Sequence, residues 1–295
     1  MTTTTTTAAS AVDAQRLEHV RQVAHDIRMG VLEQGEAQGE GYVGQALGIA
    51  DVLAGLYGDT LRLRPEDPEW EERDLFLLSI GHYALALYSA LAAARVIPRE
   101  ELLTYAADGS RLPMSGMKTY TPGMEISGGS LGHGLGQAVG MALGLRLRGQ
   151  HERRVVNLLS DGELNEGSTW EAAMSAAHWR LGNLVALVDL NGLQADGRTE
   201  DVLRLEPQED RWASFDWRVL RIDGNDLHQV LGALDAATAV AAPEGTPTVI
   251  LCDTRLAHGV PVLEAKDKLH FLRVAPEEWP VAKDQLTARH EGEQR

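Results

Sequence analysis

The sequence predicts an α/β fold in which a parallel sheet carries helices on both faces. The first observation is that short apolar runs alternate along the chain with longer segments of helical spacing. The second is that these runs are continuously apolar, which is typical of strands buried on both faces. A chain of 295 residues is also long enough for one large domain with a sizeable core.

Apolar residues that recur every three or four positions predict the helices. In the first helix, Leu17, Val20, Ile27 and Val31 share one face. Pro98 occupies the favoured first position of a later helix. The predicted helices are residues 12–34, 44–57, 83–95, a helix that begins at 98, 131–147, 169–181 and 226–240.

Short apolar runs bounded by polar turns predict the strands. The predicted strands are residues 75–79, 154–159, 184–188, 217–222 and 248–252. Residues 109–130 are irregular and rich in Gly, Pro, Ser and Thr. A loop of that length inside a compact domain is usually functional.

The two ends of the chain differ from its middle. Residues 1–10 contain a threonine run without the basic and apolar segments of a secretory signal, and we expect a disordered lead. Residues 277–295 are charged, and we expect a loose tail. The domain itself is therefore predicted to span residues 11–276.

Composition excludes several classes of function. The formal net charge of -16 disfavours binding to nucleic-acid backbones and to anionic membranes. No apolar stretch approaches the roughly 18 residues of a transmembrane helix. Cys252 is the only cysteine, so no internal disulfide forms, and its apolar surroundings predict a buried strand position. We expect a cytoplasmic protein that acts on small molecules.

The most specific pattern is Ser160-Asp161-Gly162, followed 30 residues after the aspartate by Asn191. Asp161 and Asn191 each follow a predicted strand, and one crossover helix joins the two strands. The carboxyl edge of an open α/β sheet is where ligands bind. A carboxylate and an amide oxygen there suit Mg²⁺ or Ca²⁺ bridged to a diphosphate. Taken singly, Asp-Gly and Asn-Gly are also ordinary turns.

A glycine-rich segment precedes and enters one predicted helix. Residues 128–140 miss the dinucleotide fingerprint, because Gln137 or Val139 occupies the third glycine position. Glycines before a helix let backbone amides approach an anion, whereas glycines within it permit close helix packing. We expect both uses here.

These motifs resemble those of a known family. Asp161-Gly162 followed by Asn191 is similar to the signature of thiamine-diphosphate enzymes, with Ser160 in place of the first glycine. Ser79-Ile80-Gly81-His82, residues 121–135 and Glu163-Leu164-Asn165-Glu166-Gly167 resemble motifs of the transketolase family, in the family's order. The resemblance extends from about residue 20 to residue 275. It implies the thiamine-diphosphate-binding fold and transfer of a two-carbon unit.

The resemblance also implies roles for individual residues. Asp161, Asn191 and the main-chain carbonyl of Leu193 would hold the metal. His82 would lie near the cofactor diphosphate, and His270 would reach the diphosphate and the donor. The positions implied to bind the cofactor are Gly81, His82, Gly132, His133, Gly134, Asp161, Gly162, Glu163 and Asn191.

Glu166 matches a family glutamate at the subunit interface. That glutamate pairs with a carboxylate across the interface, and two coupled carboxylates could relay protons. The alternative is an ordinary glutamate at a helix start, where the helix dipole favours negative charge.

Length points to a divided enzyme. A full transketolase is about twice as long, and its pyrimidine-binding half contributes the glutamate that activates the cofactor. The chain therefore resembles the amino-terminal subunit of a split transketolase. We expect a partner that resembles the carboxy-terminal half, and a heterotetramer of two such pairs.

Two positions depart from the family pattern. Tyr42 and Met117 stand where family histidines contact the hydroxyl groups of the ketose donor. A buried polar group without its partner costs about 1–3 kcal/mol, so an ordinary sugar phosphate should fit poorly. A less hydroxylated donor, including a 2-oxo acid, is an alternative, and so is transfer of an acyl rather than a ketol unit. Two other classes remain open, a component of a decarboxylating 2-oxo acid enzyme and a catalytically silent scaffold.

Overall fold

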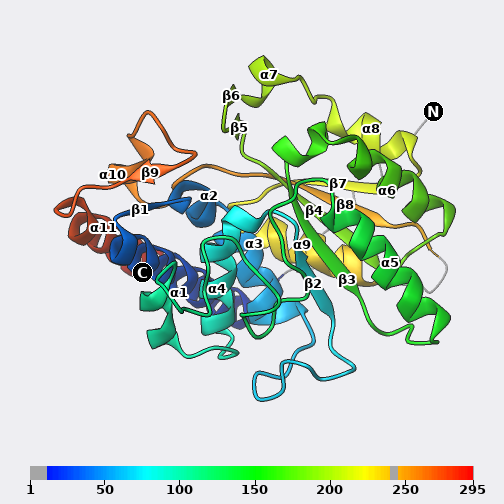
Figure 1. The fold of residues 1–295 in the computed structure, drawn as a ribbon, viewed down its shortest axis with the longest axis horizontal. Helices are drawn as coiled ribbons and strands as arrows, with labels where there is room; N and C mark the ends of the chain where they lie inside the picture. The colour runs from blue at the N-terminus through cyan, green and yellow to red at the C-terminus, as the bar shows by residue number, and fades with distance from the viewer. Residues whose placement is uncertain (1–11, 240–244, 295) are drawn as a thin grey trace.

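The computed structural model describes residues 12–239 and 245–294, and within them a parallel sheet lies between two layers of helices (Figure 1). The fold class predicted from the sequence is confirmed. The sheet has the spatial order β2-β3-β4-β8-β7. Its strands are β2 (Leu75–Leu78), β3 (Val155–Ser160), β4 (Leu184–Leu190), β7 (Arg218–Asp223) and β8 (Thr248–Asp253).

The register of the sheet brings the polar strand ends together. β3 and β4 are parallel neighbours joined through a helix, and Ser160 lies opposite Asp189. β4 is paired in the same direction with β8, so Leu190 lies opposite Asp253. All four residues stand at the carboxyl edge of the sheet, where the chain turns away and backbone groups become available to a ligand.

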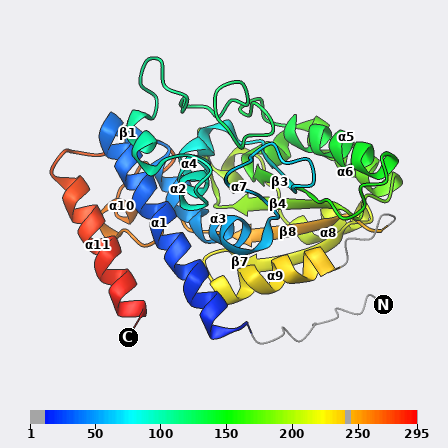
Figure 2. The same cartoon turned by 90° about the horizontal axis from the view of Figure 1, so that it is seen from below.

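Alternation along the strands builds one core on each face of the sheet. In β4, Val185 and Leu187 join the core under one helical layer, whereas Leu184, Ala186 and Val188 join the other. Successive side chains of a strand point to opposite faces. A continuously apolar strand can therefore serve two cores, which Figure 2 shows as helices above and below the sheet.

Most helices of the two layers lie close to their predicted bounds. α1, α2, α3, α4 and α9 contribute to one core, and α5 and α6 contribute to the other. The α-helices are α1 (Ala14–Gln38), α2 (Val43–Gly48), α3 (Ala50–Gly55), α4 (Ala84–Ala93), α5 (Gly134–Leu147), α6 (Gly167–His178), α7 (Thr199–Val202), α8 (Gln208–Ser214), α9 (Leu227–Ala239), α10 (Pro261–Glu264) and α11 (Glu278–Glu293).

Two predicted helices differ in detail. The helix predicted for residues 44–57 is divided at Ile49 into α2 and α3, and a π-helical turn, Leu56–Thr60, follows. Gly48 ends α2 where the backbone of Arg255 approaches, and a Cβ on Gly48 would lie 2.7 Å from Arg255 O. The helix that begins after Pro98 is a short 3-10 helix, Arg99–Thr104.

Two pairs of very short strands were not predicted. β1 (Glu40–Gly41) is antiparallel to β9 (Leu272–Arg273), and β5 (Leu193–Gln194) is antiparallel to β6 (Gly197–Arg198). A strand of two residues has no periodicity that a sequence could reveal. The first pair brings the segment after residue 41 beside the segment before residue 272.

The carboxy-terminal segment forms a docked helix instead of the loose tail that we expected. α11 packs on α1, and its side chains Trp279, Ala282 and Leu286 are buried. The Trp279 ring fills the space beside Gly35, where a Cβ would lie 2.6 Å from the ring. Charged residues outnumber these three in the segment, so the sequence did not indicate an apolar helix face. The lead predicted for residues 1–10 lies outside the described residues.

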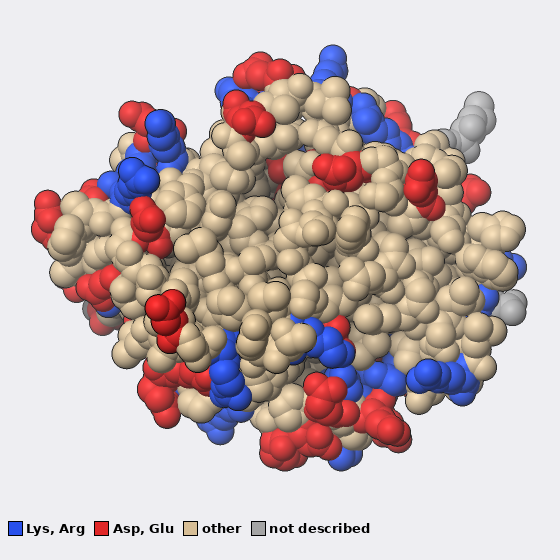
Figure 3. Space-filling view, viewed as in Figure 1, with Lys and Arg blue, Asp and Glu red and all other residues tan. Residues whose placement is uncertain are grey.

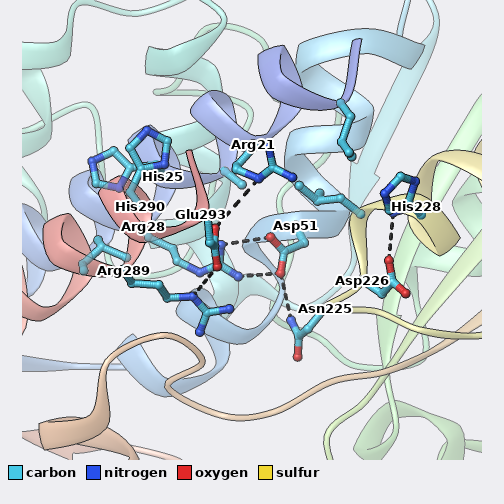
Figure 4. Close-up of a pocket in the computed structure, with 14 residues that line it drawn as sticks. Arg21, His25, Arg28, Asp51, Asn225, Asp226, His228, Arg289, His290 and Glu293 are labelled. Carbon is cyan, nitrogen blue, oxygen red and sulfur yellow. Dashed lines mark hydrogen bonds and ion pairs between the residues drawn. The ribbon is translucent and has the colours of Figure 1, made fainter. Parts of the chain in front are cut away.

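A network of ion pairs and hydrogen bonds joins α1 to α3, α11 and the loop before α9 (Figure 4). Arg28 donates two hydrogen bonds to the Asp51 carboxylate, at 2.9 and 2.5 Å, and both side chains are buried. Asn225 donates to Asp51 and to Gly48 O. A cavity of about 370 Å³ adjoins this pair, and Arg289 of α11 lines it. The network ties the start of α3 to the loop that follows β7.

Two further sequence predictions can be compared with the structure. Cys252 is fully buried in β8, as predicted. Among the described residues, no helix is both long and apolar enough to cross a bilayer.

Candidate functional site

Asp161 follows β3 and is held by neutral partners only. Its Oδ1 accepts a hydrogen bond from Gly162 N at 2.8 Å. Its Oδ2 accepts from Gly192 N at 2.9 Å and from Thr199 Oγ1 at 2.8 Å. Burial raises the pKa of Asp161 to about 6, although the Thr199 hydrogen bond opposes the shift. A carboxylate in this environment lacks a compensating positive charge.

Asn191 is fixed after β4 by three hydrogen bonds. Its Nδ2 donates to Tyr83 Oη and to Asp189 Oδ2, both at 2.8 Å. Its Oδ1 accepts from Leu193 N at 3.0 Å. The adjacent Gly192 N donates to Asp161, so the segment after β4 that contains the predicted ligands Asn191 and Leu193 lies against the predicted ligand Asp161 after β3, at the carboxyl edge of the sheet.

Asp189 is a site residue that the sequence did not indicate. It is 1 % exposed, and its carboxylate accepts from Tyr83 Oη at 2.5 Å and from Thr254 Oγ1. Burial raises the pKa of Asp189. The sequence does contain a sign of this role, because Asp189 is a carboxylate inside the apolar run of β4 and such a residue is rarely buried without partners. Through Asn191, Asp189 orients the predicted metal site.

The donor set suits a hard divalent cation. Two buried carboxylates, Asp161 and Asp189, lie near each other without a basic partner among the hydrogen bonds that hold them. In the described ranges, no group of three His, Cys, Asp or Glu side chains could hold a metal. A metal here would therefore take the Asp161 carboxylate together with amide, main-chain and diphosphate oxygens, which is the pattern for Mg²⁺. The residues present fit such an ion.

Glycines at the end of β2 create a close backbone approach. Gly81, which begins the turn Gly81–Tyr83, faces the loop, and a Cβ there would lie 2.7 Å from Gly129 N. Gly129 N donates to Ser79 O at 3.0 Å, and Gly116 N donates to Gly81 O at 3.2 Å. The loop predicted to be functional is thus anchored at the sheet edge, where backbone amides could approach an anionic group.

Glu163 ties the glycine-rich segment to this edge. The side chain is fully buried, and its Oε1 accepts from Ser79 Oγ and from Gly132 N, the latter at 2.8 Å. Ser79 Oγ in turn accepts from Gly134 N at 3.0 Å. Burial raises the pKa of Glu163 to about 7. Glu163 thus holds Gly132 and Gly134, two predicted cofactor-binding positions, at the start of α5.

Glu166 and His133 lie at the surface. Both side chains are exposed, and each residue immediately precedes a helix, α6 or α5. A Cβ on Gly132, whose φ is +83°, would lie 2.7 Å from Glu166 Cβ. The close approach places Glu166 beside the glycine-rich segment, on a surface that a partner could reach.

A cluster of rings occupies the other side of the site. The Tyr42 ring lies 4.7 Å from the His82 ring, 5.7 Å from His270 and 5.0 Å from Phe271, measured between centroids. The His82 and His270 rings are 5.6 Å apart. Three predicted site residues, from segments far apart in sequence, therefore meet here. His82 precedes Tyr83, which connects this cluster to Asp189.

Met117 differs from the ring cluster. Its side chain is 37 % exposed, and its backbone oxygen accepts from Tyr120 N and Thr121 N at 3.1 Å. The neighbouring Gly116 is anchored to Gly81, so Met117 lies on the loop that borders the site.

We expect His82→Gln to reduce the loss of stability in acid. Burial, aided by the nearby His270, lowers the pKa of His82 to about 4. The folded-state pKa lies below the unfolded value, so the stabilisation is full above about pH 6.5 and is lost as the pH falls toward 4. Urea unfolding across this pH range should show that the free energy of unfolding falls by roughly 2 kcal/mol less in His82→Gln than in the wild type. An equal fall in both proteins would contradict the lowered pKa of His82. The control is His151→Gln, at an exposed turn.

Comparisons with known proteins agree with this geometry. Residues 19–291 match the family model described as transketolase, thiamine diphosphate binding domain. A transketolase family protein of Sinorhizobium fredii is 58 % identical over 259 residues, which are 88 % of this chain and 92 % of that protein. The 6-deoxy-6-sulfo-D-fructose transketolase subunit of a Clostridium strain is 38 % identical over 89 % of this chain and 94 % of its own length. The apulose-4-phosphate transketolase subunit of Actinobacillus succinogenes is 37 % identical over 83 % and 87 %.

Solved structures show the same fold. Transketolase from Campylobacter jejuni superposes with a TM-score of 0.82 at 27 % identity, covering 94 % of this chain and 43 % of that one. A transketolase variant from Pichia stipitis gives 0.82 at 27 % identity, covering 92 % and 40 %. The chain thus matches less than half of these longer transketolases but most of the separately encoded subunits. It belongs to the transketolase family and carries that family's thiamine diphosphate binding domain.

Proposed function

We propose that the chain is the thiamine-diphosphate-binding subunit of a two-subunit transketolase, which transfers a two-carbon ketol unit from a ketose donor to an acceptor aldehyde. The observation that carries the proposal is the contact at the carboxyl edge of the sheet between Asp161, after β3, and the segment of Asn191 and Leu193, after β4. Relatives of similar length are named as transketolase subunits, and the names of two specify 6-deoxy-6-sulfo-D-fructose and apulose-4-phosphate.

The proposed metal is Mg²⁺, held by the Asp161 carboxylate, Asn191 and the main chain of Leu193. The cofactor diphosphate would lie against the glycine-rich backbone near Gly81 and Gly132. When bound, thiamine diphosphate supplies a carbon nucleophile and an electron sink for breaking a carbon–carbon bond. The metal would offset the desolvation of the Asp161 carboxylate, which burial otherwise makes costly.

The side chains of this chain would bind and orient the cofactor and the donor. Burial lowers the pKa values of His82 and His270, so both imidazoles are neutral near pH 7 and can donate or accept hydrogen bonds. We propose that they contact the diphosphate and the donor. The Tyr42 ring packs against both and would fill space that a donor hydroxyl could otherwise enter.

A partner subunit completes the proposal. The partner would supply the pyrimidine-binding half, and two pairs would form a heterotetramer in the cytoplasm. Charged side chains gather at the rim of the face in Figure 3, whereas its middle is largely uncharged although the protein carries a charge of -16. Interface cores are depleted in charged residues. The partner would contact the surface around α6. This surface carries the exposed side chains Met174 in α6, Trp179 just after it and Glu166 before it.

The functional test is a donor screen with the reconstituted pair. We expect a ketose donor and an aldehyde acceptor to give a new ketose two carbons longer than the acceptor, detected by mass. Release of carbon dioxide from a 2-oxo acid, without ketol transfer from any ketose, would instead favour the decarboxylating enzyme.

Tyr42 and Met117 give a test of donor choice. In Tyr42→His with Met117→His, imidazoles would restore partners for donor hydroxyls, at about 0.5–1.5 kcal/mol for each hydrogen bond. We expect kcat/KM for a ketose phosphate, relative to the native donor, to rise about tenfold. Most of the gain should come from Tyr42, since Met117 is partly exposed. Met114→His, at another exposed methionine of the same loop, is the control; an unchanged ratio would mean that the hydroxyls bind elsewhere.

A further inference from the structure

Gln45 lies beside the ring cluster and makes two contacts with His270. It belongs to α2, is 1 % exposed, and reaches the segment before β9. Its Nε2 is 2.8 Å from His270 O and 2.9 Å from His270 Nδ1. Gly44 permits this approach, because a Cβ there would lie 2.4 Å from Leu269 O.

These two contacts determine the orientation of the amide. A carbonyl oxygen only accepts hydrogen bonds, so His270 O requires the NH₂ group of Gln45. The flipped amide would place two oxygens 2.8 Å apart, which is repulsive. The same NH₂ group faces His270 Nδ1 and also donates there, so Nδ1 must be unprotonated and accept.

The tautomer of His270 follows from this contact. A neutral imidazole carries one hydrogen, and with Nδ1 as the acceptor the hydrogen is on Nε2. Protonation of Nδ1 would set its N–H against the NH₂ group of Gln45. The His82 and Tyr42 rings pack on His270 and restrict its rotation. Among the described residues, His270 Nε2 makes no hydrogen bond, which leaves its N–H available.

We propose that Gln45 is a positioning residue that fixes His270 as the neutral Nε2–H tautomer and thereby presents one N–H donor to an oxygen of the bound cofactor or substrate. The presence of that oxygen rests on the proposed function, whereas the tautomer is a property of this chain alone. The role resembles that of groups that orient a histidine ligand by holding its other ring nitrogen.

Nitrogen-15 NMR of the His270 ring tests the tautomer in the purified chain. We expect a protonated Nε2 and an accepting Nδ1 at neutral pH. The Gln45→Glu variant offers acceptors only, so its His270 should gain a hydrogen on Nδ1. A wild-type Nδ1–H tautomer, or ring shifts that do not change in Gln45→Glu, would overturn the proposal. Gln208→Glu is the matched control, because Gln208 is also fully buried and its Nε2 donates to Leu205 O instead.

A second variant covers the case in which Gln45→Glu does not fold. Gln45→Met keeps the side-chain length but removes the donor, so both His270 tautomers should appear. In the reconstituted enzyme, kcat/KM should fall about tenfold in Gln45→Met, the loss expected for one misdirected hydrogen bond. Unchanged kcat/KM despite mixed tautomers would overturn the donor role. An inactive wild-type pair would count against the proposed function and leave the NMR result standing.

Discussion

Asp161→Ala is expected to abolish Mg²⁺-dependent binding of thiamine diphosphate while the fold persists. The change removes the one carboxylate among the proposed metal ligands. Loss of a group that only orients a metal ligand lowers affinity by up to about a hundredfold, so loss of the ligand itself should lower the affinity for the cofactor at least as much. The fold should survive because Asp161 stands on the turn after β3 and outside both apolar cores. Calorimetric titration of the reconstituted complex, with and without Mg²⁺, measures the effect.

The control for this change is Asp196→Ala. Asp196 is exposed in the turn between β5 and β6, close in sequence to the site but outside the proposed ligand set. It should bind the cofactor as the wild type does. Equal affinities for Asp161→Ala and wild type would remove the metal assignment, provided that circular dichroism shows both folded.

The purified chain without a partner should turn nothing over and bind the cofactor only weakly. The described residues form the domain that matches less than half of a full transketolase, and the proposed pyrimidine pocket lies in the partner. Addition of the partner should restore ketol transfer in proportion to complex formed. Robust ketol transfer by the chain alone would refute the divided-enzyme proposal.

Interface variants sharpen this second prediction. Trp179 is 46 % exposed just after α6, and we expect Trp179→Glu to weaken assembly about tenfold or more, because a charge would be buried in an apolar interface. Leu103→Glu is the control, since Leu103 is 59 % exposed in a different segment, the 3-10 helix after Pro98. Equal partner affinity for both variants would move the interface away from α6.

The sequence was sufficient for elements that carry a long periodic or apolar signal. α1, α9 and all strands of the parallel sheet lie within a few residues of their predicted bounds. The β1–β9 pair could not be predicted, since two-residue strands depend on tertiary contact alone. α11 was missed because Trp279 and Leu286 bury a face that most of its charged neighbours do not share.

The candidate site divides in the same way. Motifs predicted Asp161, Asn191 and His82, which the structure places at one edge of the sheet. The hydrogen bonds from Thr199 to Asp161 and from Gln45 to His270 were not predictable, because Thr199 and Gln45 reach the site from other segments. Neither residue belongs to one of the motifs recognised in the sequence, and only the fold shows what their side chains contact.

The most direct measurement is a crystal structure of the reconstituted complex with thiamine diphosphate and Mn²⁺ in place of Mg²⁺. The anomalous signal of manganese locates the ion independently of the protein. We predict a single strong peak within ligand distance of the Asp161 carboxylate, Asn191 Oδ1 and Leu193 O, with the diphosphate on its open side. A manganese peak elsewhere, or a diphosphate held by the partner alone, would contradict the proposal.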